Sequence, residues 1–302
     1  MDSPGGGVHG VAGSSIVPNF VQGSAPMASV FVLDKRVLQS VGYPMFSEVL
    51  SLEDFSRILA DIGYQGMELW EPPPAIVLPY LVSTIAKHGL RLVGMEGTTR
   101  GLNDRHCLSR VEAELRGNIE LAATHGVRHL TLHAGLTIPE QTEDESIDNC
   151  VVALKRIAPH ARDRGVLLVL ENLNPLDNPL QDGQSVAYVA NVCQGVSDPH
   201  VKMLLDIYSA QITDGNIIET IRRHIGSIGH FQVAGVPGRG EADEWQELNY
   251  SAICRLIASL GYEGFVGQEF KPGPDPEGSL RRMFAICDHE LCRPSGRPLE
   301  RP

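Results

Sequence analysis

The chain has 302 residues, of which 42% are hydrophobic, so it can bury a large core in one or two domains. Its formal net charge is −12, from 37 acidic and 25 basic residues. An acidic chain repels phosphate backbones and anionic membrane surfaces, so neither nucleic acid nor a membrane is expected as its partner. No stretch approaches the ~18 consecutive apolar residues of a membrane-spanning helix.

The first 26 residues are rich in Gly, Ser and Pro, and they lack the basic start and apolar centre of a secretion signal. We therefore expect residues 1–30 to be a disordered extension, residues 31–293 to fold as one domain, and residues 294–302 to form a tail. The sequence leaves open whether Met1 or Met27 is the first residue. The cysteines are scattered without a C-x-x-C pair, which is typical of reduced thiols in a cytoplasmic protein. They are Cys107, Cys150, Cys193, Cys254, Cys287 and Cys292.

From Val37 onward a short apolar run, a polar turn and an amphipathic stretch alternate along the chain. Eight apolar runs predict strands at Val37–Val41, Gly66–Trp70, Leu90–Met95, His129–His133, Val166–Leu170, Val201–Leu205, Ile228–Val233 and Gly264–Gly267. The amphipathic stretches predict helices at Leu52–Ile62, Ala75–His88, Arg105–Thr124, Ser146–Arg164, Ser185–Cys193, Asn216–His224, Tyr250–Leu260 and Gly278–Leu291.

Helix-end signals support this alternation. Glycine often follows a predicted helix directly, as expected where the chain needs a left-handed backbone. These glycines are Gly63, Gly89, Gly126, Gly165 and Gly261. Ser51 and Asn249 stand where helix N-caps are expected.

Eight strand–helix units predict the fold. Leu167–Leu170 is a continuous apolar run, as in a parallel strand that is buried on both faces. The sequence therefore predicts an α/β protein with a single (β/α)8, or TIM, barrel. A doubly wound sheet is the alternative, but no G-x-G-x-x-G follows the first predicted strand.

Polar residues occur where four consecutive strands end. Glu171, Asp206 and Glu269 follow the fifth, sixth and eighth runs, and Gln232 lies near the end of the seventh. They are about one βα unit apart, so they should converge at the barrel mouth. A single such acid is often a helix cap or an ion-pair partner. Three buried carboxylates repel one another, and a divalent cation would relieve this; oxygen ligands favour Mg²⁺ or Mn²⁺.

Further polar residues face the same mouth. His133 is a candidate substrate contact, with a core or capping histidine as the alternative. Arg239 could hold a substrate carboxylate, since its fork matches that group, or it could be a solvated loop residue. Lys271 could likewise hold the substrate carboxylate or be a solvated residue. The remaining polar candidates near the mouth are Glu68, Trp70 and Glu96.

Three blocks in the second half resemble hydroxypyruvate isomerases. They are MLLDIYSAQITDGNIIETIRRHIGSIGH (203–230), GHFQVAGVPGRGEADEWQELNY (229–250) and GYEGFVGQEFKP (261–272). The resemblance covers about Val37 to Asp288. It places the chain among the xylose isomerase-like barrels, a group that also includes ketose 3-epimerases and AP endonucleases. It implies a metal held by Glu171, Asp206, Gln232 and Glu269, with Glu171 and Glu269 as the acid/base pair.

One position departs from this pattern. The family usually has DIYHxQ, with a histidine that contacts the substrate in related enzymes, and Ser209 stands at that position here. We therefore include Ser209 among the candidate substrate contacts. An AP endonuclease is disfavoured, because its chemistry needs a His-rich three-zinc cluster and this mouth offers mainly oxygen ligands.

Three functions remain. The first is a metal-dependent isomerase that interconverts hydroxypyruvate and tartronate semialdehyde, or a similar keto acid or sugar, through an enediolate. The second is a ketose 3-epimerase or polyol-ketone dehydratase, because both begin with the same proton abstraction. The third is a sugar-acid binding protein with reduced catalysis. The expected partner is a small molecule, and a homo-oligomer is expected by analogy with related barrels.

Overall fold

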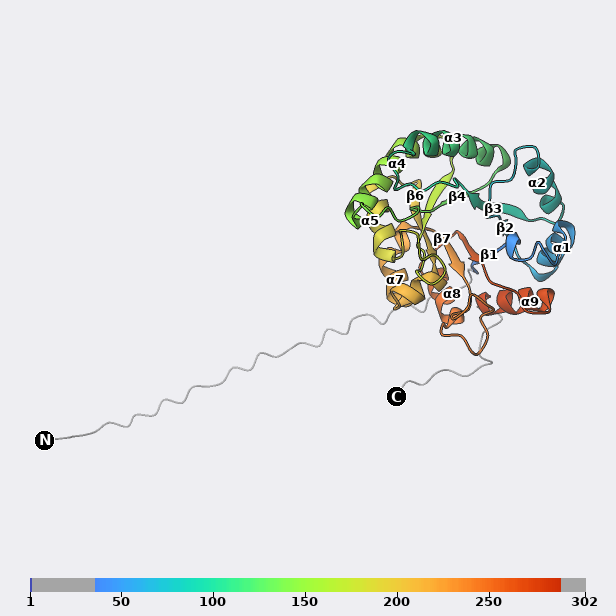
Figure 1. Ribbon diagram of the computed structural model, residues 1–302. Helices are drawn as coiled ribbons and strands as arrows, with labels where there is room; N and C mark the ends of the chain where they lie inside the picture. Colours follow the sequence, from blue (N-terminus) through green and yellow to red (C-terminus); the bar gives the residue numbers. More distant parts are fainter. Residues whose placement is uncertain (2–35, 289–302) are drawn as a thin grey trace, which may run out of the picture. The chain divides into compact units, whose positions relative to one another are not determined.

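The computed structural model describes residues 36–288 and Met1. Eight parallel strands form a closed barrel in chain order (Figure 1). They are β1 (Leu38–Gly42), β2 (Gly66–Glu68), β3 (Arg91–Glu96), β4 (His129–Leu132), β5 (Leu167–Glu171), β6 (Val201–Asp206), β7 (Ile228–Val233) and β8 (Phe265–Gln268). Apart from Met1, the predicted extension at 1–30 lies outside the described residues, as do Cys292 and the predicted tail at 294–302.

Within residues 36–288, nine α-helices surround the barrel (Figure 1). They are α1 (Leu52–Ile62), α2 (Leu78–Lys87), α3 (Leu108–His125), α4 (Glu143–Arg164), α5 (Val186–Val196), α6 (Ile207–Thr213), α7 (Ile217–His224), α8 (Tyr250–Ser259) and α9 (Pro276–Cys287). Two 3-10 turns, η1 (Tyr43–Met45) and η2 (Ile225–Ser227), precede α1 and β7. The predicted single barrel is therefore confirmed.

The boundaries differ from the prediction at a few places. Strand β2 ends at Glu68 rather than Trp70, where its register with β3 shifts. Helix α2 begins at Leu78, with Pro79 in its first turn, rather than at Ala75. The short helix α6 is absent from the prediction, because its seven residues directly follow β6 without a turn signal.

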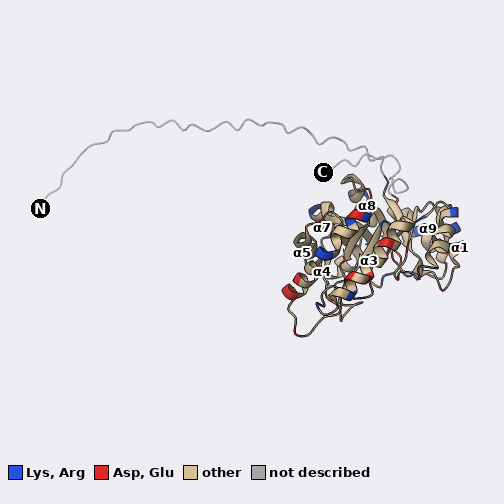
Figure 2. Ribbon diagram, turned by 90° about the horizontal axis from the view of Figure 1, so that it is seen from above, with Lys and Arg blue, Asp and Glu red and all other residues tan. Residues whose placement is uncertain are grey.

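The predicted helix ends are also found. Ser51 and Asn249 accept hydrogen bonds from backbone amides in the first turns of α1 and α8. Gly63, Gly126 and Gly165 have left-handed backbones just after α1, α3 and α4. Acidic and basic residues occur on the outer helices (Figure 2). No helix in the described part of the chain is long and apolar enough to cross a membrane.

The strand register sets the height of the site. Asp206 of β6 pairs with Gln232 of β7, and Gln232 pairs with Gly267 of β8. Side chains alternate along each strand between the barrel interior and the helix layer. The carboxyl ends of β5 to β8 therefore present their last inward side chains at one level, above a buried apolar core.

Candidate metal centre and active site

Three carboxylates meet at the carboxyl ends of the strands. Glu171 ends β5, Asp206 ends β6, and Glu269 follows β8. One oxygen from each lies within 4.8 Å of one from each of the others. Asp206 is 1% exposed and Glu171 is 7% exposed. We call these three residues the carboxylate cluster. The structure brings together the acids that the strand spacing predicted at the barrel mouth.

Asp206 is held rigidly from three sides. Its backbone amide donates to Oδ1 of Asn172 at 2.9 Å, and the amide of Tyr208 donates to Asp206 Oδ1 at 3.0 Å. The Ser209 hydroxyl donates to Asp206 Oδ2 at 2.6 Å and accepts from Asn174 at 3.0 Å. These contacts explain why α6 follows β6 without a loop: Asp206 is both a strand end and the N-cap of that helix.

Arg239 provides part of the counter-charge. Its guanidinium lies 3.0 Å from Asp206 Oδ2 and 2.8 Å from Glu269 Oε2, and it stacks over the Tyr208 ring at 4.3 Å. A further contact joins its Nε to Asp177 at 3.4 Å. One guanidinium can offset only one of the three negative charges in the carboxylate cluster.

The pKa values of the carboxylate cluster reflect this excess of negative charge. Burial raises the pKa of Glu269 well above its usual range, and the nearby Glu171 raises it further, while Arg239 opposes the shift. Burial likewise raises the pKa of Asp206 against the lowering effect of Arg239. Since desolvated carboxylates remain undercompensated, the site favours a further cation.

Gln232 completes an oxygen donor set. It is 5% exposed, and its side-chain oxygen is buried with no hydrogen-bond partner among the described residues. An orphaned buried acceptor is rare and calls for a ligand. Three carboxylates and this amide oxygen fit a hard divalent cation such as Mg²⁺ or Mn²⁺. The four residues therefore fit the divalent cation that the sequence implied.

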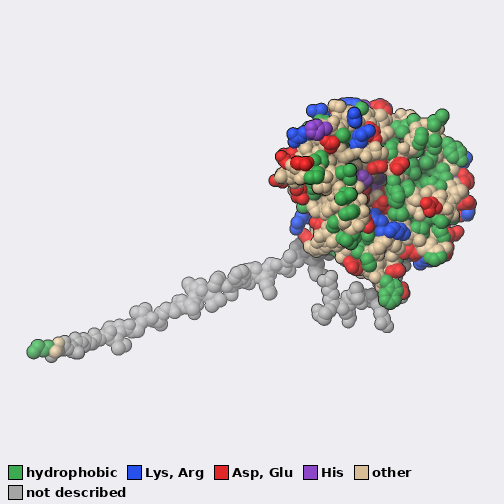
Figure 3. All heavy atoms as spheres, in the orientation of Figure 1, with side chains coloured by type: hydrophobic (Ala, Val, Ile, Leu, Met, Phe, Trp, Pro, Cys, Tyr) green, Lys and Arg blue, Asp and Glu red, His purple; other side chains and the backbone are tan. Residues whose placement is uncertain are grey.

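The cluster lies at the floor of a cavity of about 960 Å³. Figure 3 shows this hollow, with acidic and histidine side chains inside it and hydrophobic side chains along its rim. Glu171, Gln232, Arg239, Glu269 and Lys271 all line the cavity. Its remaining polar and apolar lining includes Glu68, Trp70, Glu96, Leu173 and Leu176.

His133 joins the carboxylate cluster to β3. Its Nε2 lies 3.1 Å from Glu171 Oε2, and its Nδ1 lies 3.4 Å from Glu96 Oε1. Burial lowers the pKa of His133, but the hydrogen bonds to Glu171 and Glu96 outweigh burial and raise it to about 10. His133 is therefore placed to orient Glu171 and to offset its charge.

Other predicted residues take different places. Ser209 is fully buried and contacts the Asp206 carboxylate, and it is not part of the cavity lining. Lys271 is exposed and lines the cavity. Three site residues were not predicted from the sequence, although they follow the Glu171 strand end directly: Asn172, Asn174 and Asp177.

Known proteins are similar to this chain in fold and in sequence. A model of the xylose isomerase-like TIM barrel family matches residues 56–286. A putative hydroxypyruvate isomerase of Homo sapiens is 38% identical over 262 residues, which cover 81% of this chain and 92% of that one. The chain belongs to the xylose isomerase-like TIM barrel family. Within the family, it is an isomerase of the hydroxypyruvate isomerase-like type.

Two further similar proteins carry other names. A 2-oxo-tetronate isomerase of Cupriavidus necator is 32% identical over 241 residues, covering 76% of this chain and 90% of that one. A crystal structure described as an AP endonuclease, family 2, from Brucella melitensis has 26% identity and a TM-score of 0.74, covering 81% of this chain and 96% of that one. Together the named isomerases support a sugar-acid isomerase.

Proposed function

We propose that the protein is a metal-dependent isomerase that interconverts hydroxypyruvate and tartronate semialdehyde through an enediolate. The observation that carries the proposal is the carboxylate cluster at the cavity floor, next to the unpartnered oxygen of Gln232. The similarity to putative hydroxypyruvate isomerases supports the choice of substrate.

The metal would be Mg²⁺ or Mn²⁺, held by Glu171, Asp206, Gln232 and Glu269. When bound, such an ion supplies Lewis acidity that stabilises negative charge developing on the oxygens of the substrate. Ser209 and Asn172 hold Asp206 in one orientation, and His133 does the same for Glu171. Outer partners that orient metal ligands in this way strengthen metal binding.

Glu171 and Glu269 are the proposed acid/base pair. They come from β5 and from the end of β8, so they reach the cavity from different sides of the barrel. One takes a proton from the hydroxymethyl carbon of hydroxypyruvate, and the same or the facing glutamate returns a proton to the neighbouring carbon. Positioned groups of this kind contribute about 10²–10⁴-fold to a rate.

Lys271 is the proposed partner of the substrate carboxylate. Arg239 already contacts Asp206, Glu269 and Asp177. Lys271 lines the same cavity and makes no ion pair with any of the described residues. An ammonium at the rim can attract an anionic substrate into an otherwise acidic cavity.

A second candidate is the same chemistry on a longer substrate. The cavity of about 960 Å³ is much larger than a three-carbon acid needs. The name of one relative, 2-oxo-tetronate isomerase, refers to a four-carbon sugar acid. Epimerisation of a ketose and dehydration of a polyol ketone remain alternatives on the same site, because each starts with the same proton abstraction.

Hydrogen exchange separates these candidates. Metal-free protein is incubated with hydroxypyruvate in D₂O, Mn²⁺ or Mg²⁺ is added, and carbon-bound hydrogen is followed by NMR. Metal-dependent formation of tartronate semialdehyde with deuterium uptake is the expected result. Exchange without that product would favour a longer sugar acid or a ketose. Ligand binding without any exchange would favour a binding protein with reduced catalysis.

The glutamate assignment has its own test. Glu269→Gln keeps the shape of the side chain but removes the base, and we expect kcat to fall by about 10²-fold or more. Glu277→Gln is the matched control, because Glu277 is half-exposed on α9 and pairs with Arg281 four residues away. Full activity in Glu269→Gln would exclude Glu269 as the acid/base residue.

A further inference from the structure

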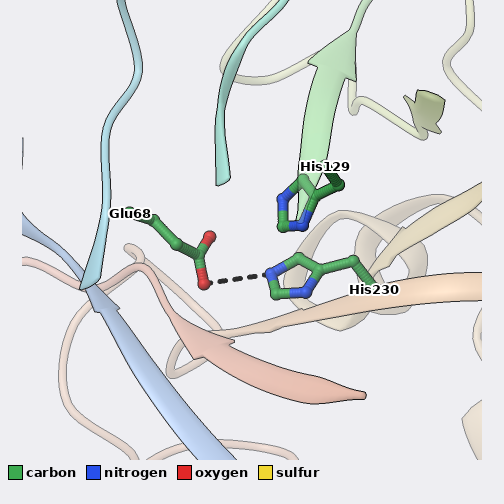
Figure 4. A group of neighbouring side chains, drawn as sticks. All are labelled: Glu68, His129 and His230. Atoms are coloured by element: carbon green, nitrogen blue, oxygen red, sulfur yellow. Dashed lines mark ion pairs between the residues drawn. The ribbon is translucent and has the colours of Figure 1, made fainter. Parts of the chain in front are cut away.

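A second group of ionisable side chains lies inside the barrel. Glu68 from β2, His129 from β4 and His230 from β7 point toward one another (Figure 4). Glu68 is 6% exposed, and both histidines are fully buried. His230 precedes Gln232 by two residues on β7, so it faces the interior one layer below the carboxylate cluster. We call these three residues the inner cluster.

The histidines of the inner cluster lack hydrogen-bond partners within residues 36–288. Neither ring nitrogen of His129 or of His230 makes a hydrogen bond to any of the described residues. Nε2 of His230 lies 3.0 Å from Glu68 Oε1, at an ion-pair distance but without hydrogen-bond geometry. Two buried imidazoles with orphaned nitrogens are exceptional, because a buried polar group without a partner loses its hydration and gains nothing.

The barrel makes space for this cluster at two glycines. A side-chain carbon at Gly94 on β3 would collide with the His129 ring. One at Gly267 on β8 would collide with the Glu68 carboxylate and the His230 ring. The rings of His129 and His230 lie with their centroids 4.3 Å apart at an angle of 37°. The interior is thus shaped around polar side chains where an apolar filling is usual.

The donor set of the inner cluster matches zinc. Each residue offers one ligand atom, and these atoms lie within 4.8 Å of one another. In a tetrahedral zinc site, bond lengths of about 2.0–2.2 Å place neighbouring ligand atoms roughly 3.3 Å apart. The His230–Glu68 distance of 3.0 Å is close to that value, and small side-chain rotations bring His129 into the same range.

We propose that Glu68, His129 and His230 form a second metal site that binds Zn²⁺, with a water from the cavity in the fourth position. Two imidazoles and one carboxylate favour zinc over Mg²⁺ or Mn²⁺, which prefer oxygen. The Ser40 hydroxyl donates to Glu68 and fixes its orientation, as outer partners of metal ligands do. The inference goes beyond the proposed reaction and does not depend on it.

The inner cluster borders the active-site cavity, because Glu68 lines that cavity. We expect the ion to enter past Glu68. Its carboxylate is also one of the charges that raise the pKa of Glu269. Zinc at the inner cluster would therefore tie β2, β4 and β7 together beneath the reaction centre and offset a negative charge next to it.

The test counts zinc in the full-length protein. The chain is stripped with a chelator, loaded with Zn²⁺ and desalted, and bound zinc per chain is measured by mass spectrometry. The background variant Asp206→Asn/Glu269→Gln weakens the carboxylate cluster and should retain about one zinc. Adding His129→Gln to that background should remove it. Equal zinc content in the two proteins would overturn the proposal.

Cobalt provides a readout that a purely structural role would not change. Co²⁺ in the background variant should give the visible bands of a tetrahedral site with nitrogen ligands, and Glu68→Gln or His230→Gln should lose them. Circular dichroism checks that each variant is folded, and Glu68→Gln keeps both histidines in case a histidine variant does not fold. An octahedral spectrum that is the same in all variants would exclude the inner cluster as a metal site.

Discussion

Arg239 and the metal should act as alternative counter-charges for the same carboxylates. In the structure the guanidinium is 12% exposed and contacts Asp206, which is 1% exposed, and Glu269, which is 14% exposed. Replacing Arg239 with Gln leaves these carboxylates buried without their cation. Removing one partner of a buried ion pair typically costs about 3–5 kcal/mol. Because Glu269 keeps some contact with water, we expect the lower end of this range, about 3 kcal/mol, for the metal-free protein.

A bound divalent cation should restore most of this loss. A ligand stabilises the folded state more when it binds that state more tightly. Without Arg239 the oxygens of Asp206 and Glu269 are free for the ion, so Mn²⁺ should bind the variant more tightly than the wild type. The free energy of unfolding is measured by urea denaturation in EDTA and in excess Mn²⁺. The difference between wild type and Arg239→Gln should be about 3 kcal/mol in EDTA and should shrink with Mn²⁺.

Arg282→Gln is the matched control for this experiment. Arg282 also pairs with a carboxylate, Glu241 at 2.7 Å, but its side chain is 55% exposed. Exposed ion pairs contribute little, so its loss should change stability by less than about 1 kcal/mol with or without metal. If Arg239→Gln were as stable as the control in EDTA, or if Mn²⁺ stabilised both variants equally, the argument that Arg239 balances the cluster would be wrong.

Three further outcomes follow from the structure. Ser209→Ala removes a hydrogen bond to Asp206 and should weaken Mn²⁺ binding by about 10–100-fold in calorimetric titrations; unchanged affinity would remove Ser209 from the support of the site. Gly63 has φ +113° at the end of α1, so Gly63→Ala should lower the free energy of unfolding by about 1 kcal/mol or more. Gly117 lies in α3 with open space around it, and Gly117→Ala should raise the same quantity by about 0.5–1 kcal/mol. A gain in Gly63→Ala or a loss in Gly117→Ala would contradict the backbone argument.

The barrel itself was predictable because its signals repeat. Eight apolar runs, the glycines after the helices and the caps at Ser51 and Asn249 all reported the same unit. The wrong predictions concern single elements. Helix α6 is too short for its periodicity to be read, and β2 is cut short by a register shift that depends on its neighbour β3.

The carboxylate cluster was predictable for a geometric reason. Strand ends in a parallel barrel share one level, so acids spaced by one unit must meet, as Glu171, Asp206 and Glu269 do. The contacts of Arg239 were not predictable. They depend on a loop in which Arg239 adopts a left-handed backbone with φ +57°, and no sequence pattern fixes the direction in which such a loop sends its side chain.

The inner cluster shows which signal the sequence analysis left unused. Side chains two residues apart on a strand share a face, so His230 had to lie beneath Gln232, and His129 had to lie on the same face as His133. A search restricted to strand ends identifies the residues of the carboxylate cluster. It does not identify the inner cluster, which lies one layer deeper in the barrel. Polar residues one layer deeper in a barrel are costly to bury, which makes them as informative as the acids at the mouth. In this chain, the possible ligand atoms of each cluster lie within 4.8 Å of one another. Gly94 and Gly267 leave space for the side chains of the inner cluster.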